Sequence, residues 1–247
     1  MLTLYAPRTR RPLDLDYLVA EYQRLGSSLV EAGGRAPGPQ EWAEAFAAED
    51  AADRALRDLY ATRAQSALGD RAFYDAVRAR EYLLAEDFTE LVATLPVGPA
   101  PRPGLPIVLS GIVADPPELL DVLNDAGAHV VTDDLSTGTR RILAPVADED
   151  PWRRLARTYL DGPVDPTRAD PVARRVQRLR DLVGQSGARG VLIVAPTFCE
   201  PEQFYLPALR TGLDVPLLYL ERESGSDLDG QLVGRIEAFV ETLEAAR

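Results

Sequence analysis

The fold is decided by the stretch Val191-Leu-Ile-Val-Ala-Pro-Thr-Phe-Cys199-Glu-Pro201. Its first half is a continuous apolar run that predicts a strand over residues 190–195, and the following segment predicts a helix over 201–211. Strands that are buried on both faces of a parallel sheet read as such continuous runs. Cys199 is the only cysteine in 247 residues, and it falls just past the carboxyl end of this strand, where open parallel sheets place their ligand sites.

The same alternation of strand and helix extends on both sides of this stretch. We predict further strands over 106–109, 129–132 and 215–220, and helices over 117–126, 152–160, 171–184 and 226–245. Apolar strands separated by amphipathic helices are typical of a parallel sheet with helices on both faces. We therefore expect a four-stranded, parallel, flavodoxin-like or Rossmann-like α/β domain over residues 105–247.

The residues before this domain read as helices. Apolar residues at three- and four-residue spacing predict one helix from Leu15 that ends at Gly33, a second that begins after Pro39, and a third over about 70–95. We expect residues 1–95 to form a helical arm or cap that packs on the α/β domain or on a partner, because its apolar stripe would otherwise face water. The proline-rich segment 96–104 predicts a linker between the two parts.

Composition excludes several classes of function. The net charge of −12 argues against nucleic-acid binding, which requires clustered positive charge. The sequence shows neither the apolar core of a signal peptide nor a run long enough to span a membrane, and a single cysteine forbids an internal disulfide. We therefore expect a cytoplasmic protein that binds neither nucleic acid nor membrane.

Three predicted strands end in small or polar residues, at Ser110-Gly111, at Asp133-Asp134 and at Thr197 to Cys199. Because the carboxyl ends of parallel strands meet at one edge of the sheet, we expect their loops to form one crevice. The helix that follows Cys199 favours a thiolate or a metal ligand at this position. The alternative is that Cys199 is a small buried residue, as free cysteines commonly are.

The loop after Asp133-Asp134 is the second candidate element. Its hydroxyls and backbone N–H groups, from Ser136 to Arg140, suit an anion, although an ordinary polar loop explains them equally. The two aspartates fit a metal site or an acid–base pair, and they are also common turn formers. His129, the only histidine, starts a predicted strand, so we expect a structural role and no Cys–His dyad with Cys199.

Five stretches carry a family resemblance, and they follow one another in the family's order: Ile107-Val-Leu-Ser-Gly111, Gly127-Ala-His-Val-Val-Thr-Asp133-Asp-Leu-Ser-Thr-Gly-Thr-Arg140, Val194-Ala-Pro-Thr-Phe-Cys199-Glu-Pro201, Val215-Pro-Leu-Leu-Tyr-Leu-Glu221, and the segment from Gly230 to Glu241. On the basis of these five stretches, the chain resembles the subunits of 2-hydroxyacyl-CoA dehydratases and benzoyl-CoA reductases. The resemblance covers essentially all residues after the linker, and the segment from Tyr5 onward is also similar to the part of the family that precedes this domain.

The resemblance implies an iron–sulfur cluster that three cysteines per subunit hold and that passes one electron to an acyl-CoA thioester after activation by an ATP-driven protein. Cys199 matches the third of these ligands, Ser136 stands at the second, and the first belongs to an N-terminal α/β domain that we expect this chain to lack. Clusters are held by several thiolates. We therefore expect no conventional iron–sulfur cluster on this chain alone.

The leading hypothesis is a short, cluster-deficient, dehydratase-like subunit of a lyase or reductase complex. It would act on an acyl-CoA with a longer, cluster-bearing subunit of the same family, or assemble as a homo-oligomer. Cys199 and Ser136 are then the candidate catalytic residues, and Cys199 is also the candidate metal ligand. The candidate substrate-binding residues are Ser110, Gly111, Thr137, Gly138, Arg140 and Glu200.

Two alternatives remain open at this stage. One is a stand-alone, non-redox enzyme for an acyl-CoA or a related carboxylate, with Cys199 as nucleophile or base. The other is a non-catalytic binding or scaffold module in which Cys199 only packs.

Overall fold

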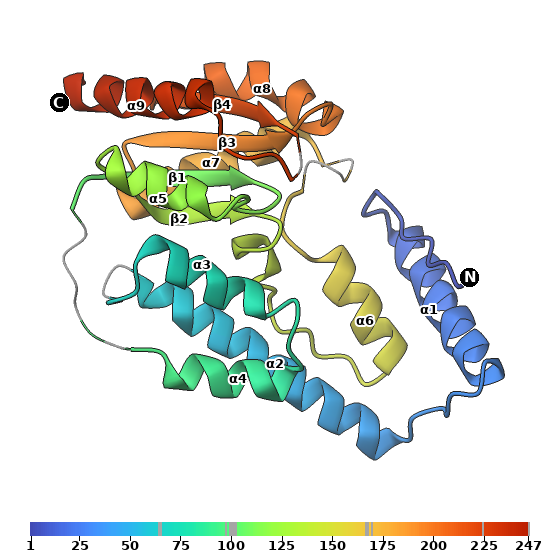
Figure 1. Ribbon diagram of the computed structural model, residues 1–247. Helices are drawn as coiled ribbons and strands as arrows, with labels where there is room; N and C mark the ends of the chain where they lie inside the picture. Colours follow the sequence, from blue (N-terminus) through green and yellow to red (C-terminus); the bar gives the residue numbers. More distant parts are fainter. Residues whose placement is uncertain are drawn as a thin grey trace.

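A four-stranded, all-parallel sheet forms the centre of the molecule, as the apolar runs predict (Figure 1). The computed structural model describes residues 1–246 except 64–65, 97, 99–102, 166–167, 169 and 224. The strands are β1 (Leu105–Gly111), β2 (Ala128–Leu135), β3 (Gly190–Pro196) and β4 (Leu217–Arg222). Their order in the sheet is β2-β1-β3-β4, which is the order of a flavodoxin-like fold.

This order creates a switch point between β1 and β3. The chain leaves β1 to form β2 on one side, and it later returns past β1 to form β3 on the other side. The connections that follow these two neighbouring strands therefore run in opposite directions, which leaves a crevice outside their carboxyl ends. Ser110 pairs in register with Asp134 of β2 and Ile193 of β3, so residues of all three strands meet at this edge.

Helices cover both faces of the sheet. One face packs on α5 (Glu118–Asp125) and α9 (Gly230–Ala245), and the other packs on α7 (Val172–Ser186) and α8 (Glu200–Gly212). Side chains of a strand alternate between the two faces. Leu109 accordingly lies in the core with α5 and α9, whereas Val108 lies in the core with α7 and α8.

The helices before residue 96 pack on the α/β part, as expected. The helices are α1 (Pro12–Glu31), α2 (Pro39–Ala61), α3 (Asp70–Ala79) and α4 (Ala85–Thr94), and α6 (Pro151–Leu160) comes after β2 in the chain. Leu56, Phe73 and Phe88 are fully buried in the same apolar cluster as the α5 and α9 face of the sheet. The apolar stripe of α1 packs on α6, with Leu18 at its centre.

One helix boundary differs from the prediction. The single helix expected over 70–95 is two helices, α3 and α4, joined by a tight turn in which the N–H groups of Arg80 and Tyr82 donate to carbonyls three residues back. Tyr82 and Leu84 lie in this turn and are each 73% exposed. A continuous helix cannot bury the consecutive residues 82–84 on one face, and the turn instead directs Phe88 into the same apolar core as Phe73.

The closing helix also starts later than expected. It begins at Gly230 because Asp229 caps it: the carboxylate of Asp229 accepts a hydrogen bond of 2.8 Å from the N–H of Leu232.

The predicted linker lies partly outside the described residues, and the division into residues 1–95 and 105–247 stays a prediction. None of the helices in the described part of the chain is both long and apolar enough to cross a membrane.

Candidate functional site

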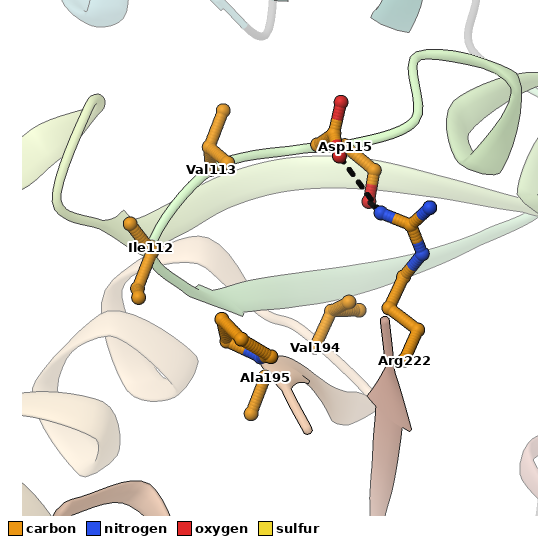
Figure 2. Close-up of a pocket in the computed structure, with 7 residues that line it drawn as sticks. Ile112, Val113, Asp115, Val194, Ala195 and Arg222 are labelled. Atoms are coloured by element: carbon orange, nitrogen blue, oxygen red, sulfur yellow. Dashed lines mark hydrogen bonds and ion pairs between the residues drawn. The ribbon is translucent and has the colours of Figure 1, made fainter. Parts of the chain in front are cut away.

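A small pocket lies at the switch point, outside the carboxyl ends of β1 and β3 (Figure 2). Its walls are mainly apolar, and an ion pair crosses it: Arg222 donates from Nη1 to the carbonyl and to the Oδ2 of Asp115, at 2.8 Å each. Arg222 is only 7% exposed. The residues that line the pocket are Ile112, Val113, Asp115, Val194, Ala195, Pro196 and Arg222.

Gly111 makes the close approach of β1 and β3 at this pocket possible. Its φ is 143°, and a Cβ atom at this position would lie 2.2 Å from the carbonyl oxygen of Val194. Only glycine fits such a combination of backbone angle and contact. Gly111 therefore has a structural reason to be glycine, and its assignment to substrate binding stays a prediction.

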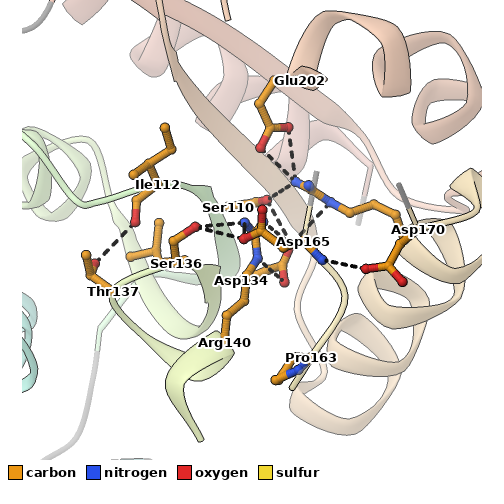
Figure 3. Close-up of polar contacts among 12 residues, drawn as sticks. Ser110, Ile112, Asp134, Ser136, Thr137, Arg140, Pro163, Asp165, Asp170 and Glu202 are labelled. Carbon is orange, nitrogen blue, oxygen red and sulfur yellow. Dashed lines mark hydrogen bonds and ion pairs between the residues drawn. The ribbon is translucent and has the colours of Figure 1, made fainter. Parts of the chain in front are cut away.

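A cluster of buried charges lies beside the pocket, at the carboxyl ends of β1 and β2 (Figure 3). Its centre is Asp134, which no solvent reaches. Arg140 donates to both of its carboxylate oxygens, from Nε at 3.1 Å and from Nη2 at 2.8 Å. Arg178 donates to it from Nε at 2.6 Å. Arg140 comes from the short 3-10 helix η2 (Thr139–Arg141), and Arg178 comes from α7.

Arg175 of α7 extends this cluster to the start of α8. Its Nη2 lies 3.1 Å from both carboxylate oxygens of Glu202 and 3.1 Å from Oγ of Ser110, and its Nε lies 3.3 Å from Asp134. Arg175 is completely buried, and its Nη1 has no hydrogen-bond partner in the part of the chain that the structure describes. Such a group is costly unless it is paired, so the carboxylates around it are essential to the fold.

The two adjacent aspartates of β2 have opposite electrostatic environments. Burial alone would raise the pKa of Asp134, but the guanidinium groups of Arg140 and Arg175 outweigh it and hold this pKa below its usual range. Burial raises the pKa of Asp133, which faces the hydroxyls of Tyr60 and Tyr74 and no arginine. Asp134 is therefore a charged anchor, whereas Asp133 accepts hydrogen bonds and burial opposes its ionisation.

The structure brings three of the sequence-predicted residues into this cluster. Ser110 is fully buried between Arg175 and Asp134. The hydroxyl of Ser136 donates to Asp165 at 3.2 Å and accepts from Nη1 of Arg140 at 3.0 Å. Ser136 contacts Arg140 directly, and Ser110 is linked to Arg140 through Asp134, whereas their catalytic and substrate-binding roles stay predictions.

The other residues of the predicted anion loop are engaged with the protein. The backbone N–H groups of Thr137 and Gly138 donate to the carbonyls of Ile112 and Leu135, at 3.1 Å each. Gly138 also packs so tightly that a Cβ would meet Asp133 and the Tyr60 hydroxyl. The loop thus stabilises the end of β2, and its contact with a substrate anion stays a prediction.

Cys199 lies at the same edge of the sheet but outside the charged cluster. It is the N-cap residue of α8, it is half-buried, and its N–H donates to the carbonyl of Pro196 at 3.0 Å. Phe198 before it has a φ of 64° and is 86% exposed, and Glu200 after it is exposed at the start of α8. His129 lies at the opposite, amino-terminal end of β2, so no Cys–His dyad forms with Cys199.

Sequence reasoning missed the arginines that organise this edge. Arg175 stands at helical spacing with Leu179 on the face of α7 that packs on the sheet, and a lone arginine within such an apolar stripe was the available signal. Arg222 ends β4 and offered no comparable signal. Its partner Asp115 is 107 residues away in the chain, a contact that only the fold reveals.

The donor set at this edge does not fit an iron–sulfur cluster. Clusters require several thiolates, and the chain has one cysteine. Ser136, which stands at the second ligand position of the resemblance, is in contact with the guanidinium of Arg140, and a cation there opposes a metal ion. Within the described residues there is no group of three or more His, Cys, Asp or Glu side chains that could hold a metal.

Comparison with known proteins identifies the family. The sequence profile of the 2-hydroxyglutaryl-CoA dehydratase D-component matches residues 1–243, which is nearly the whole chain. The chain belongs to this family. This confirms the resemblance that the motifs of the α/β part indicate.

Several curated members of the family are similar to this chain over about two thirds of its length. The beta subunit of lactoyl-CoA dehydratase from Anaerotignum propionicum is 29% identical over 176 residues, which are 67% of this chain and 47% of that subunit. The beta subunit of (R)-phenyllactyl-CoA dehydratase from Clostridium sporogenes is 27% identical over 177 residues, 68% of this chain and 47% of that subunit. The beta subunit of (R)-2-hydroxyglutaryl-CoA dehydratase from Acidaminococcus fermentans is 27% identical over 180 residues, 68% of this chain and 48% of that subunit. The matched part thus spans about half the length of these relatives.

Proposed function

We propose that this chain is a cluster-deficient subunit of a 2-hydroxyacyl-CoA dehydratase that works with a cluster-bearing partner subunit. The observation that carries this proposal is the pocket at the switch point between β1 and β3, in a chain whose relatives are named as beta subunits of three such dehydratases. In open α/β sheets this is the position where ligands bind.

The pocket is small, with a free volume of about 30 Å³, so in this proposal it holds only the reacting end of an acyl thioester. Ile112, Val113 and Val194 supply an apolar wall for the acyl group. Two N–H positions of Arg222 hold Asp115 and the Ser226 carbonyl, but its Nε is buried and has no hydrogen-bond partner among the described residues. In this proposal the Arg222 side chain shifts on substrate binding so that this N–H donates to the thioester carbonyl oxygen, and a buried donor that gains an acceptor contributes strongly to affinity.

The electron-transfer chemistry of the complex would come from the partner. One thiol and one hydroxyl in contact with a guanidinium do not hold a cluster, so the proposed role of this chain is to form part of the substrate pocket. In this proposal Cys199 and Ser136 lie at the edge that faces the partner's site.

The test is reconstitution under anaerobic conditions. This chain is co-purified with a family subunit that carries the cluster cysteines, and dehydration of a 2-hydroxyacyl-CoA is followed by the absorbance of the enoyl product in the presence of the activator. We expect a heteromer, and activity only when both subunits are present. The proposal fails if the partner is equally active alone, or if the two chains elute separately on size exclusion.

A matched pair of arginine variants locates the pocket in this assay. Arg222→Gln keeps a polar side chain but removes the guanidinium, and we expect kcat/KM to fall at least about tenfold, the loss of one charge-assisted hydrogen bond. Arg210→Gln, on the exposed side of α8, should leave kcat/KM unchanged. Equal activity of Arg222→Gln and the parent would show that this pocket does not bind the thioester.

A further inference from the structure

A second cavity, remote from the β3 and β4 ends of the sheet, is lined by an unusual number of arginines. It lies between α2, α6 and the loop that follows η2, and it has a volume of about 550 Å³, within the range of small-molecule sites. Six arginines line it, in a protein with a net charge of −12. They are Arg54, Arg57, Arg80, Arg140, Arg141 and Arg154.

Four of these arginines are neutralised by carboxylates. Arg80 pairs with Glu49 and Asp53, Arg141 donates to Glu81 at 2.7 Å, and Arg154 donates to Asp50 at 2.6 Å. The fourth is Arg140, which pairs with Asp134 of the buried cluster and with Asp165. These pairs shape the cavity, but they leave it little free charge.

Arg54 and Arg57 are different, because neither forms an ion pair with a carboxylate in the described residues. They stand three positions apart on α2, so their side chains lie on the same side of the helix. Arg57 donates from Nη2 to the carbonyl of Leu143 at 3.1 Å, which fixes its side chain against the loop, and its other N–H groups make no hydrogen bond within the described part of the chain. The cavity therefore presents two uncompensated guanidinium charges side by side.

The remaining walls combine apolar side chains with three carboxylates, Glu49, Asp50 and Asp53, which pair with Arg80 and Arg154. Phe46, Leu143 and Leu155 line the cavity, and Val146 of the covering loop completes it. Two adjacent guanidinium groups beside an apolar wall are complementary to a dianion that is attached to an apolar body. A phosphate monoester carries nearly two negative charges at pH 7, and arginines bind its oxygens in pairs.

We propose that this cavity binds a small phosphomonoester with an apolar body, with Arg54 and Arg57 on the phosphate and Leu143 and Leu155 against the body. The proposal does not depend on the proposed dehydratase function, because the cavity shares only Arg140 with the charged cluster at the carboxyl edge. The same chemistry has two possible sources, a free phosphorylated metabolite and the 3′-phosphate of coenzyme A.

The primary test is calorimetric titration of the intact chain with phenyl phosphate. We expect saturable binding, at least about tenfold weaker binding of inorganic phosphate, and none of benzyl alcohol. Arg54→Gln/Arg57→Gln should weaken phenyl phosphate binding at least about tenfold, because both charge-assisted contacts are lost. Arg180→Gln/Arg210→Gln removes two arginines that do not line the cavity, and it should bind like the parent.

Two further measurements make the test decisive. Arg54 is exposed, so Arg54→Gln alone leaves the fold intact and should give an intermediate loss of affinity even if the double variant unfolds. Coenzyme A and dephospho-coenzyme A differ only in the 3′-phosphate. If coenzyme A binds more tightly and Arg54→Gln abolishes this difference, the site is assigned to coenzyme A. If the two bind equally, the site is assigned to a free phosphomonoester. No saturable binding of phenyl phosphate, or equal affinity of parent and Arg54→Gln, would overturn the proposal.

Discussion

Asp133 and Asp134 are neighbours in β2, and their carboxylates lie on opposite faces of the sheet, both fully buried. Asp133 accepts hydrogen bonds from the hydroxyls of Tyr60 and Tyr74, on the α2 and α3 side. Asp134 faces the α7 side and binds guanidinium groups. Adjacent residues of one type thus make different contributions to the free energy of folding.

Replacing each aspartate by asparagine separates these contributions. Asp134→Asn leaves the arginines of the cluster without their shared anion, and we expect it to lower the free energy of unfolding by about 3 to 5 kcal/mol. Asp133→Asn keeps an acceptor and a polar group for the two tyrosines, and we expect a loss of only about 1 kcal/mol. Urea unfolding at pH 7 measures both, and equal losses would contradict the assignment of the arginine pairing to Asp134 alone.

The same two variants predict opposite dependences on pH. The pKa of Asp134 is held below its usual range in the folded protein. Its stabilising contribution is therefore complete above the unfolded value of about 3.9 and is lost as the pH falls toward the folded pKa. The difference in unfolding free energy between the parent and Asp134→Asn should shrink when the pH is lowered from 6 to 3.

For Asp133 the sign is reversed, because burial raises its folded pKa. The folded protein then binds more protons than the unfolded chain between the two pKa values, so stability falls as the pH rises through this window. Asp133→Asn should gain stability relative to the parent when the pH is raised from 3 to 6. If the unfolding free energies of the two variants, relative to the parent, changed with pH in the same direction, the pKa values of the two carboxyls would not be shifted in opposite directions.

Arg175 and Glu202 allow a test of pairing within the cluster. Arg175→Met should lower the unfolding free energy by about 3 to 5 kcal/mol, since it leaves Glu202 buried without its cation. Adding Glu202→Gln should recover part of this loss. A double-mutant cycle measured by urea unfolding gives the coupling energy, and additive losses would mean that the two side chains do not interact in solution.

Two glycine substitutions compare a constrained backbone with a free one. Gly111→Ala places a methyl group against the Val194 carbonyl and should destabilise the protein by several kcal/mol, since the clash is with backbone. Gly184→Ala, inside α7 with nothing near its Cβ position, should stabilise it by about 0.5 to 1 kcal/mol. Thermal unfolding should thus move the two melting temperatures in opposite directions.

The sheet was predictable from sequence because each strand carries its own signal. The run from Val191 to Ala195 is apolar throughout, as expected for a strand that packs against an apolar core on each face of the sheet. The break between α3 and α4 was not predictable in the same way. Its cause is the burial of Phe88 in the same apolar core as Phe73, and the apolar spacing of 70–95 alone fits one continuous helix.

The charged cluster was beyond local reasoning for a similar reason. Asp134 and Arg178 are 44 residues apart, and Arg175 and Glu202 are 27 apart, so their pairing depends on how α7 and α8 pack on the sheet. Ser110, Ser136 and Arg140 were expected at this edge because each follows a strand predicted from the sequence. The position of a candidate site at the carboxyl edge of the sheet was therefore predictable from the sequence, but the ion pairs at this edge were not.

The shared core of the helical segment and the sheet has a consequence for how the molecule unfolds. Phe73 and Phe88 lie in the same apolar cluster as Ile107 of β1, so separating residues 1–95 from the sheet would expose both partners to water. A chain cut between Thr94 and Leu105 should remain a noncovalent complex of its two fragments. Both the intact and the cut protein should lose their secondary structure in one cooperative transition, because neither part should stay folded after the other has unfolded.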